Sequence, residues 1–427
     1  MEYHSKLEKI AKTVPALISI LLGVMIFTSR LAISVRAIAL VISLVLILFT
    51  VPLKELLKTY IEHPIARAAA LFYACFIVGS FYGGAPTPER WHLLKIYLPL
   101  LWIGFLITFF QKFSLKTPKT STYIAIFVHG AVLTTVLGCL NTWHIVNVTE
   151  LVHSHLTFDP PEYPFGTFSF SLSLATYLCA QQMRYAATQK IHIYYAILFL
   201  FLTFFIFFIS HQRTAYILYA ILILFYGYQH WQIRGIIKAS IWIGLLILSA
   251  NYSSPTFQTR SIEAVHDVQN YQQGNPISST GLRLFFIKES LLLWEKEPLF
   301  GYGTGSFKDT YLTIDGYNAG GQKNTPENAL DQPHNDSAYI LVQLGFFGFI
   351  FFAWLLFQQV YQSFWSSSRL PHFEKQCAQG FILCVIFGSL DATLFFYATS
   401  MTDYMFFSAL FYASMQRLTN SGIRSIQ

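Results

Sequence analysis

Most of this chain is built from apolar segments of about 20 residues, and only one long stretch, residues 251–335, is polar. A helix needs about 20 mainly apolar residues to cross a bilayer. The sequence of 427 residues contains about twelve such segments. We therefore predict an all-α integral membrane protein with about twelve transmembrane helices and one long loop between helices 9 and 10.

The expected spans divide the chain into three parts. Residues 1–250 would contain helices 1 to 9, residues 251–335 a loop domain, and residues 336–427 helices 10 to 12 with a cytoplasmic tail. The first segment follows lysines, as a secretory signal does, but lacks a small-x-small cleavage site, so we expect an uncleaved span. The spans lie near residues 14–29, 37–53, 66–83, 93–110, 121–140, 165–183, 191–209, 213–229, 234–250, 336–362, 376–394 and 402–416.

Composition limits the remaining possibilities. Hydrophobic residues make up 54% of the chain and charged residues 11%, which excludes disorder and argues against an ordinary soluble domain. The cysteines all fall within expected spans and show neither a disulfide framework nor a CxxC metal pattern, so we expect small buried side chains. They are Cys75, Cys139, Cys179, Cys377 and Cys384.

The distribution of Lys and Arg predicts the orientation. With the N-terminus inside, 17 of these residues lie at cytoplasmic ends and 5 at the short outer ends, namely Arg30, Arg36, Arg90, Lys95 and Arg213. Cytoplasmic loops carry the excess of positive charge in membrane proteins. We therefore expect both termini in the cytoplasm and residues 251–335 outside, in the periplasm. The net charge of +7 then reflects topology and is no argument for nucleic acid.

Two features stand out inside the long loop. Residues 284–296 are expected to form an amphipathic helix, because Leu284, Ile287, Leu291 and Trp294 recur at helical spacing. This stripe would pack on the helix bundle or on the membrane surface. The glycine run 301–305 lacks the preceding strand and following helix of a dinucleotide site, so we interpret it as a flexible turn.

Basic side chains gather near this loop. Arg213 begins the eighth span, Arg260 and Arg283 lie in the loop, and His334 stands where the loop enters the tenth span. Two arginines together match a pyrophosphate, because each guanidinium can bind phosphate oxygens through two hydrogen bonds. Taken singly, each arginine has an ordinary explanation: Arg213 can extend to the headgroups, and the loop arginines can be solvated.

His334 precedes three possible helix caps, Asn335, Asp336 and Ser337. The first turn of a helix attracts anions and lowers the pKa of a neighbouring imidazole. A neutral histidine there can accept a proton from a hydroxyl, while the simpler alternative is an interfacial histidine bonded to water. Metal binding by His334, Asp331, Asp336 and Asp391 is disfavoured because their spacing matches no strong ligand pattern. We expect no metal and no cofactor.

At this point the sequence resembles the O-antigen ligases. His334-Asn335, nine residues, and Gly345-x-x-Gly348 resemble that family's H-N-x9-G-x-x-G signature. Further similar segments follow in consistent order over roughly residues 200–400: Gln212-Arg213-Thr214-Ala215, Gln258-Thr259-Arg260, Thr280-Gly281-Leu282-Arg283-Leu284 and Gly388-Ser389-Leu390-Asp391.

The resemblance implies a glycosyltransferase of the bacterial inner membrane, with its active site facing the periplasm. It would move O-antigen polysaccharide from undecaprenyl pyrophosphate to lipid A–core, without metal or nucleotide. It implies that Arg213 and Arg283 hold the donor pyrophosphate and that His334 activates the acceptor hydroxyl. Arg260 and Asp391 are weaker assignments. The membrane lipids and these two glycolipids are the partners expected.

Three alternatives stay open. An O-antigen polymerase or a protein O-oligosaccharyltransferase would share the donor site and differ in the acceptor. A multi-span transporter would show two similar halves and a substrate site near the bilayer midplane. This chain shows no halving and no convincing pair of charges deep in two central spans, so transport is the most distant alternative.

Overall fold

The computed structural model describes residues 2–143, 145, 165–210, 212–314, 316–318, 320–365, 372–391 and 394–415. In these ranges the chain is helical, and the sole strand-like pairing is one bridge between Tyr317 and Lys323. The helices are α1 (Glu2–Phe27), α2 (Ile33–Thr50), α3 (Leu53–Glu62), α4 (Pro64–Tyr82), α5 (Thr87–Tyr97), α6 (Pro99–Lys112), α7 (Thr120–Thr142), α9 (Phe165–Arg184), α10 (Gln189–Phe204), the π-helical turn η1 (Phe205–Ile209), α11 (Arg213–Ser253), α12 (Pro255–Gln272), α13 (Ser279–Lys296), α14 (Phe307–Tyr311), α15 (Asp336–Phe364), α16 (His372–Asp391), η2 (Leu394–Phe396) and α17 (Ala398–Met415).

The all-helical prediction is confirmed for the described residues. Each expected span overlaps a helix, and 7 helices are long and apolar enough to cross a membrane. The expected total of about twelve spans, the cytoplasmic termini and the three-part division of the chain stay predictions. The five cysteines are buried and unpaired, as expected.

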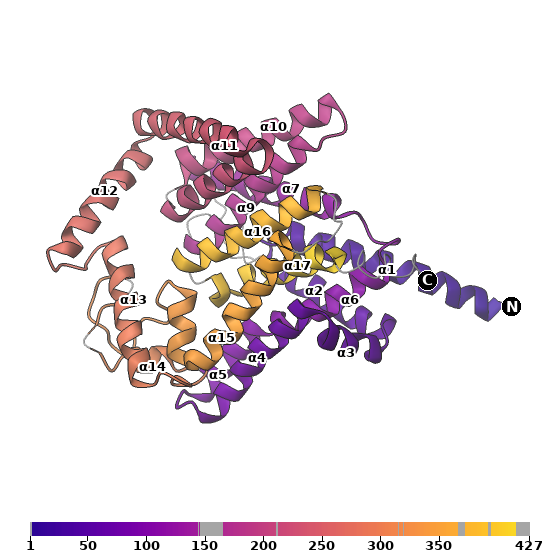
Figure 1. Ribbon diagram of the computed structural model, residues 1–427, viewed down its shortest axis with the longest axis horizontal. Helices are drawn as coiled ribbons and strands as arrows, with labels where there is room; N and C mark the ends of the chain where they lie inside the picture. The colour runs from indigo at the N-terminus through magenta and orange to yellow at the C-terminus, as the bar shows by residue number, and fades with distance from the viewer. Residues whose placement is uncertain are drawn as a thin grey trace.

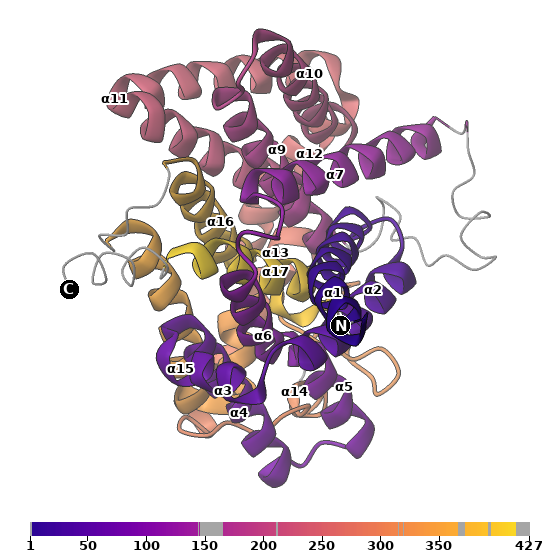
Figure 2. The ribbon, with the colours of Figure 1, turned by 90° about the vertical axis from the view of Figure 1, so that its right-hand side faces the viewer.

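Two expected spans belong to one element, α11. Non-helical backbone at Gln232 (φ 52°) divides it into two halves that fold back on each other, as Figure 2 shows. The halves touch at Gly227 and Gly235. A Cβ added at Gly235 would lie 1.8 Å from the Gly227 carbonyl oxygen, so the hairpin depends on both glycines.

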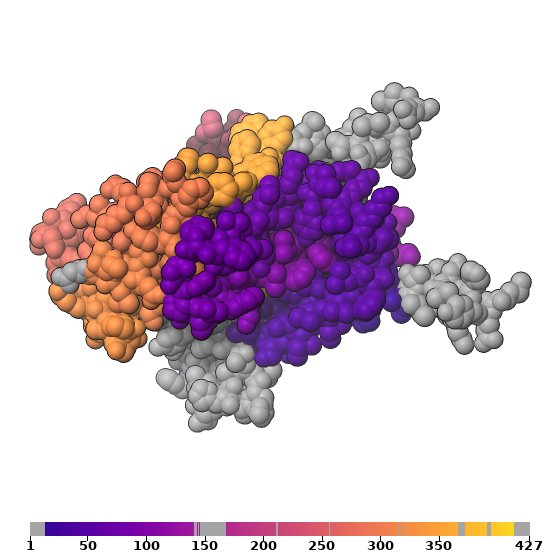
Figure 3. All heavy atoms as spheres, turned by 90° about the horizontal axis from the view of Figure 1, so that it is seen from below, coloured from indigo at the N-terminus to yellow at the C-terminus, as the bar shows by residue number. Residues whose placement is uncertain are grey.

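The polar stretch forms α12, α13 and α14, which gather at the end of the molecule away from the N-terminus (Figure 1). Helix α12 is an element that the sequence did not lead us to expect. The space-filling view shows this orange region side by side with the purple surface of the N-terminal third (Figure 3). The contacts behind this arrangement join α15 to α4 and to α13.

The glycine run 301–305 forms the expected turn, and it is also a packing element. Helix α15 breaks at Gly345 (φ 61°), and the glycine run fills the break. Tyr302 and Gly303 donate backbone hydrogen bonds to the carbonyls of Val342 (3.0 Å) and Gln343 (2.7 Å). A broken helix inside a membrane protein needs such internal partners, because lipid offers none.

Helix α13 begins at Ser279, earlier than expected, where Ser278 caps it by accepting a hydrogen bond from the Gly281 N–H at 3.1 Å. The buried face also differs from the expected one. Leu282, Phe286 and Leu293 are buried on the side of α15, whereas Leu284 and Leu291 of the expected stripe are 41% and 39% exposed. Ile287 and Trp294 of the stripe are part-buried, so the stripe is only partly covered by the bundle, and its contact with a membrane surface stays a prediction.

Candidate functional site

One ridge of α13 brings together three of the predicted site residues, Arg213, Arg283 and His334. Thr280, Arg283 and Phe286 are spaced three residues apart, so they follow one row along the helix. Arg213 donates a hydrogen bond to Thr280 Oγ1 (3.0 Å), and the ring of His334 stacks on Phe286 with centroids 6.3 Å apart. From Thr280 to Phe286 the helix rises by about 9 Å. Arg213, Arg283 and His334 therefore lie along a short stretch of one helix face.

His334 occupies a strained position. Its φ of 55° lies in the left-handed region, which a non-glycine residue adopts only at a cost. The side chain of Gln332 holds this conformation, because its carbonyl oxygen accepts the His334 N–H at 2.8 Å. Strained residues held by their surroundings cluster at functional sites. The strained backbone therefore supports a functional role of His334 independently of its position at the start of α15.

Gln332 also constrains the imidazole. Since a backbone N–H can only donate, the Gln332 oxygen faces it, and the amide nitrogen faces His334 Nδ1 at 3.3 Å. An amide NH2 group donates, so Nδ1 accepts in this arrangement and the proton of the neutral ring lies on Nε2. Gln332 was not among the predicted site residues. The sequence signal that could have found it is its place two residues before His334.

The start of α15 is fixed by its caps. Of the three expected candidates, Asn335 is the N-cap: its Oδ1 accepts the Ala338 N–H at 2.9 Å, and its Nδ2 donates to the Leu390 carbonyl at 2.9 Å. Asp336 is buried and accepts the N–H groups of Leu394 and Phe395 (2.9 and 3.2 Å). Its two carboxylate oxygens therefore bind backbone N–H groups of η2. Asp391 is the last residue of α16, and its side chain lies outside the described part.

Arg213 is the centre of a charge cluster. It donates to Asp267 (2.7 Å) through Nη1 and to Glu263 (3.0 Å) through Nη2, both on α12. Arg260 donates to the same Glu263 oxygen at 2.9 Å. Two arginines thus face two carboxylates, and the cluster has no net charge. The sequence places these residues in one region, but it does not indicate that α12 supplies the anions that bind Arg213.

Asp267 is the better anchored of the two carboxylates. It also accepts the backbone N–H of Thr280 at 3.2 Å, which ties α12 to the first turn of α13. Burial raises the pKa of Asp267, but hydrogen bonds from Arg213 and Thr280 lower it by more, so the net pKa lies below the ordinary carboxyl value. Asp267 is therefore ionised at neutral pH and pairs with Arg213 as a charge.

A second arginine cluster lies inside the bundle. Arg30, in the turn between α1 and α2, lies 3.5 Å from Asp403 of α17, and the two side chains are 4% and 0% exposed. The sequence does not indicate this pair, because 373 residues separate the partners. Hydroxyl groups surround the pair: Ser171 accepts from Arg30 (2.8 Å) and donates to Asp403 (2.9 Å), and Ser29 also donates to Asp403.

The molecule so described is a helical protein with apolar helices long enough to cross a membrane and a polar site formed by α11, α12, α13 and the start of α15. Residues 198–353, from α10 to the second half of α15, match the family model described as O-antigen ligase. This match supports membership of the O-antigen ligase family and, more broadly, of the ligase and polymerase superfamily. No curated protein matches the sequence.

The matched segment contains Arg213, Arg260, Arg283 and His334, together with the glycines at 345 and 348. It ends before Asp391. The late Gly388–Asp391 segment, which also resembles the O-antigen ligases, therefore lies outside the match. The match covers α11 to the first part of α15, where the charge cluster and His334 lie.

Proposed function

We propose that this protein transfers O-antigen polysaccharide from undecaprenyl pyrophosphate to a sugar hydroxyl of lipid A–core. The reaction would take place at the periplasmic face of the bacterial inner membrane. The observation that supports it most is the α13 ridge, which brings Arg213, Arg283 and His334 together inside the segment that matches the O-antigen ligase family. Such a set combines phosphate binding with a proton acceptor.

In the proposed reaction the acceptor hydroxyl oxygen attacks the anomeric carbon of the donor sugar. A new glycosidic C–O bond forms, and the bond from that carbon to the pyrophosphate oxygen breaks with its electron pair. His334 takes the hydroxyl proton, and undecaprenyl pyrophosphate leaves. Arg283 and Arg213 stabilise the negative charge that grows on the leaving group.

Before the donor binds, carboxylates already neutralise the positive charge of Arg213. Asp267 and Thr280 occupy Nη1, Glu263 occupies Nη2, and Nε is buried without a partner among the described residues. A pyrophosphate can gain a two-point contact with Arg213 by displacing Glu263, whose side chain is 42% exposed. Arg283 would then make the first contact with the donor and Arg213 the second.

The proposed base must accept a proton at Nε2 or Nδ1. With the Gln332 amide facing Nδ1, the resting ring is protonated on Nε2. Acceptance at Nε2 therefore requires the proton to move to Nδ1 and Gln332 to turn its oxygen towards it. A carboxylate at position 332 would favour that tautomer directly, because it can only accept hydrogen bonds.

The test uses the full chain in a lipid bilayer with the lipid-linked polysaccharide and lipid A–core. His334→Ala is expected to lower kcat by about 10²–10⁴-fold, the usual worth of general-base catalysis. The matched control is His266→Ala, which removes an exposed histidine of α12. Gln332→Glu is expected to retain or raise kcat at saturating donor.

The outcomes separate the roles of His334. Normal transfer by His334→Ala would contradict the assignment of this residue as base. If His334→Ala is inactive and Gln332→Glu is also strongly impaired in kcat, then His334 acts as a donor through Nε2–H and the base is another group. A stable, correctly inserted protein in each case, checked by size-exclusion chromatography, excludes unfolding as the cause.

The acceptor is tested separately in a deletion strain. Core without O-antigen, together with accumulated lipid-linked polymer, is the result expected for a ligase. Core carrying a single repeat would identify a polymerase instead. Normal lipopolysaccharide with an unglycosylated protein would identify a protein O-oligosaccharyltransferase.

A further inference from the structure

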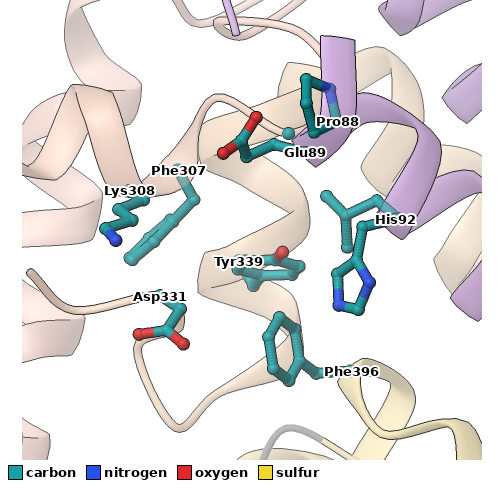
Figure 4. Close-up of a pocket in the computed structure, with 10 residues that line it drawn as sticks. Pro88, Glu89, His92, Phe307, Lys308, Asp331, Tyr339 and Phe396 are labelled. Carbon is teal, nitrogen blue, oxygen red and sulfur yellow. The ribbon is translucent and has the colours of Figure 1, made fainter. Parts of the chain in front are cut away.

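A cavity of about 430 Å³ lies where α5, α14, the segment before α15 and η2 meet. Its volume falls within the range of about 300–1,000 Å³ that is typical of small-molecule sites. Figure 4 shows Glu89 and His92 reaching it from one side and Lys308 and Asp331 from the other, with Tyr339 between them. None of these residues belongs to the predicted site.

Aromatic rings form the floor of the cavity. Phe307 and Tyr339 are buried, with ring centroids 5.3 Å apart, and Phe396 stands perpendicular to Tyr339 at 5.6 Å. The faces of aromatic rings carry partial negative charge and attract polarised C–H groups. A sugar ring presents such C–H groups on its faces and hydroxyl groups around its edge, and Phe396, which is part-buried, is the floor ring that can contact it.

The polar rim has unused hydrogen-bonding capacity. In the described part of the chain, Glu89, His92, Lys308 and Asp331 form no hydrogen bond or ion pair with another residue. The two carboxylates can only accept hydrogen bonds and the ammonium can only donate, which together match hydroxyl groups. The two carboxylates and the ammonium give the rim two negative charges and one positive. This balance favours a hydroxyl-rich saccharide without phosphate over an anionic ligand.

The cavity is close to His334 but is formed by other elements than the arginine site. Asp331 lies three residues before His334. A row of ring contacts also joins them: His334 to Phe286, Phe286 to Tyr311 (6.1 Å) and Tyr311 to Phe307 (5.7 Å). Arg213 and Arg283 come from α11 and α13, whereas the cavity walls come from α5, α14, α15 and η2. Two substrates can therefore approach His334 from different elements.

We propose that this cavity binds a sugar residue of the acceptor glycan, next to the sugar whose hydroxyl reacts. The proposal rests on the proposed transfer reaction and names the acceptor part of its site. Phe396, which is part-buried, provides the stacking surface above the buried Phe307 and Tyr339, and Glu89 and Asp331 accept hydrogen bonds from sugar hydroxyls. The donor pyrophosphate is held elsewhere, so the cavity contributes to acceptor affinity and not to donor affinity.

The experiment measures binding without turnover. The full chain carrying His334→Ala, in lipid nanodiscs, is titrated with core oligosaccharide released from lipopolysaccharide that lacks O-antigen. Glu89→Gln combined with Asp331→Asn is expected to weaken binding at least tenfold. The matched control combines Asp309→Asn with Glu295→Gln, two exposed acidic residues that do not line the cavity, and it should bind like the parent.

The same variants in the chain with His334 intact are expected to raise KM for lipid A–core at least tenfold while changing kcat less than twofold. Equal binding of core oligosaccharide by the cavity variant and its control would overturn the proposal, as would absence of binding to the parent. The same titration is made with released O-antigen. If the cavity variant loses binding of O-antigen while its binding of core oligosaccharide is unchanged, the acceptor assignment is overturned. Because the titration needs no catalysis, its result is independent of whether His334 acts as the base.

Discussion

Arg30 and Arg213 both pair with carboxylates, but their surroundings differ. Arg30 and Asp403 are almost fully buried between the α1–α2 turn and α17, and serine hydroxyls surround them. Arg213 is 17% exposed, and its partners Asp267 and Glu263 are 10% and 42% exposed. The first pair is enclosed by the bundle, while the second lies at the joint between α11, α12 and α13.

This difference in burial assigns different roles to the two clusters. A buried charge needs every partner that it has, because the interior offers no water in exchange. A partly exposed arginine can exchange one carboxylate for another anion at small cost, since water screens the intermediate states. The Arg30 cluster is therefore suited to hold the bundle together, and the Arg213 cluster is suited to bind and release a ligand.

The largest effect is expected from Asp403→Asn. This change keeps the shape of the side chain but leaves the Arg30 charge buried without its counter-charge, which costs about 3–5 kcal/mol of stability. Thermal unfolding followed by size-exclusion chromatography in detergent measures the loss. A variant as stable as the wild type would show that the serine hydroxyls alone are sufficient for Arg30, and the comparison of the two clusters would fail.

A smaller loss is expected from Asp267→Asn, which serves as the matched change at the other cluster. The amide still accepts from Thr280, so the joint between α12 and α13 loses the charged part of its hydrogen bonds, worth about 1–3 kcal/mol. The same unfolding assay compares the two variants directly. A loss equal to or larger than that of Asp403→Asn would mean that the α12 joint, and not the bundle, limits stability.

The sequence predicted the helical architecture well, because apolar runs of the right length leave little choice of structure. It also predicted Arg213, Arg283 and His334 as separate candidates, and the structure places all three along α13. It could not predict their partners. Asp267 and Glu263 lie 54 and 50 residues from Arg213, and Asp403 lies still farther from Arg30. No local pattern encodes such pairings.

One local feature was also misread for a physical reason. Helix α13 carries two apolar stripes, and periodicity alone does not tell which of them α15 covers, so the more exposed stripe with Leu284 and Leu291 was chosen. The glycines at 301, 303 and 305 lie in the expected turn and adopt positive φ. The sequence did not indicate that their missing side chains also allow close packing against α15 and α4.

The smallest effect on stability is expected from Glu263→Gln. Unlike the other two variants, it should improve a property of the protein, the binding of the donor. Glu263 is exposed, so its ion pairs contribute only about 0–1 kcal/mol and the variant should unfold like the wild type. Removing this anion frees Arg213 Nη2 and Arg260 for phosphate oxygens. Donor KM should therefore fall by about two- to tenfold, the scale of one charge at a few ångströms in a partly wet site.

The measurement is transfer at varied concentrations of lipid-linked donor, with Glu295→Gln as the control for an exposed glutamate on neighbouring α13. A lower donor KM in Glu263→Gln alone means that Glu263 and the pyrophosphate compete for Arg213. A higher donor KM would show that Glu263 positions Arg213 for the donor, and the Arg213 cluster would then resemble the Arg30 cluster in needing all of its partners.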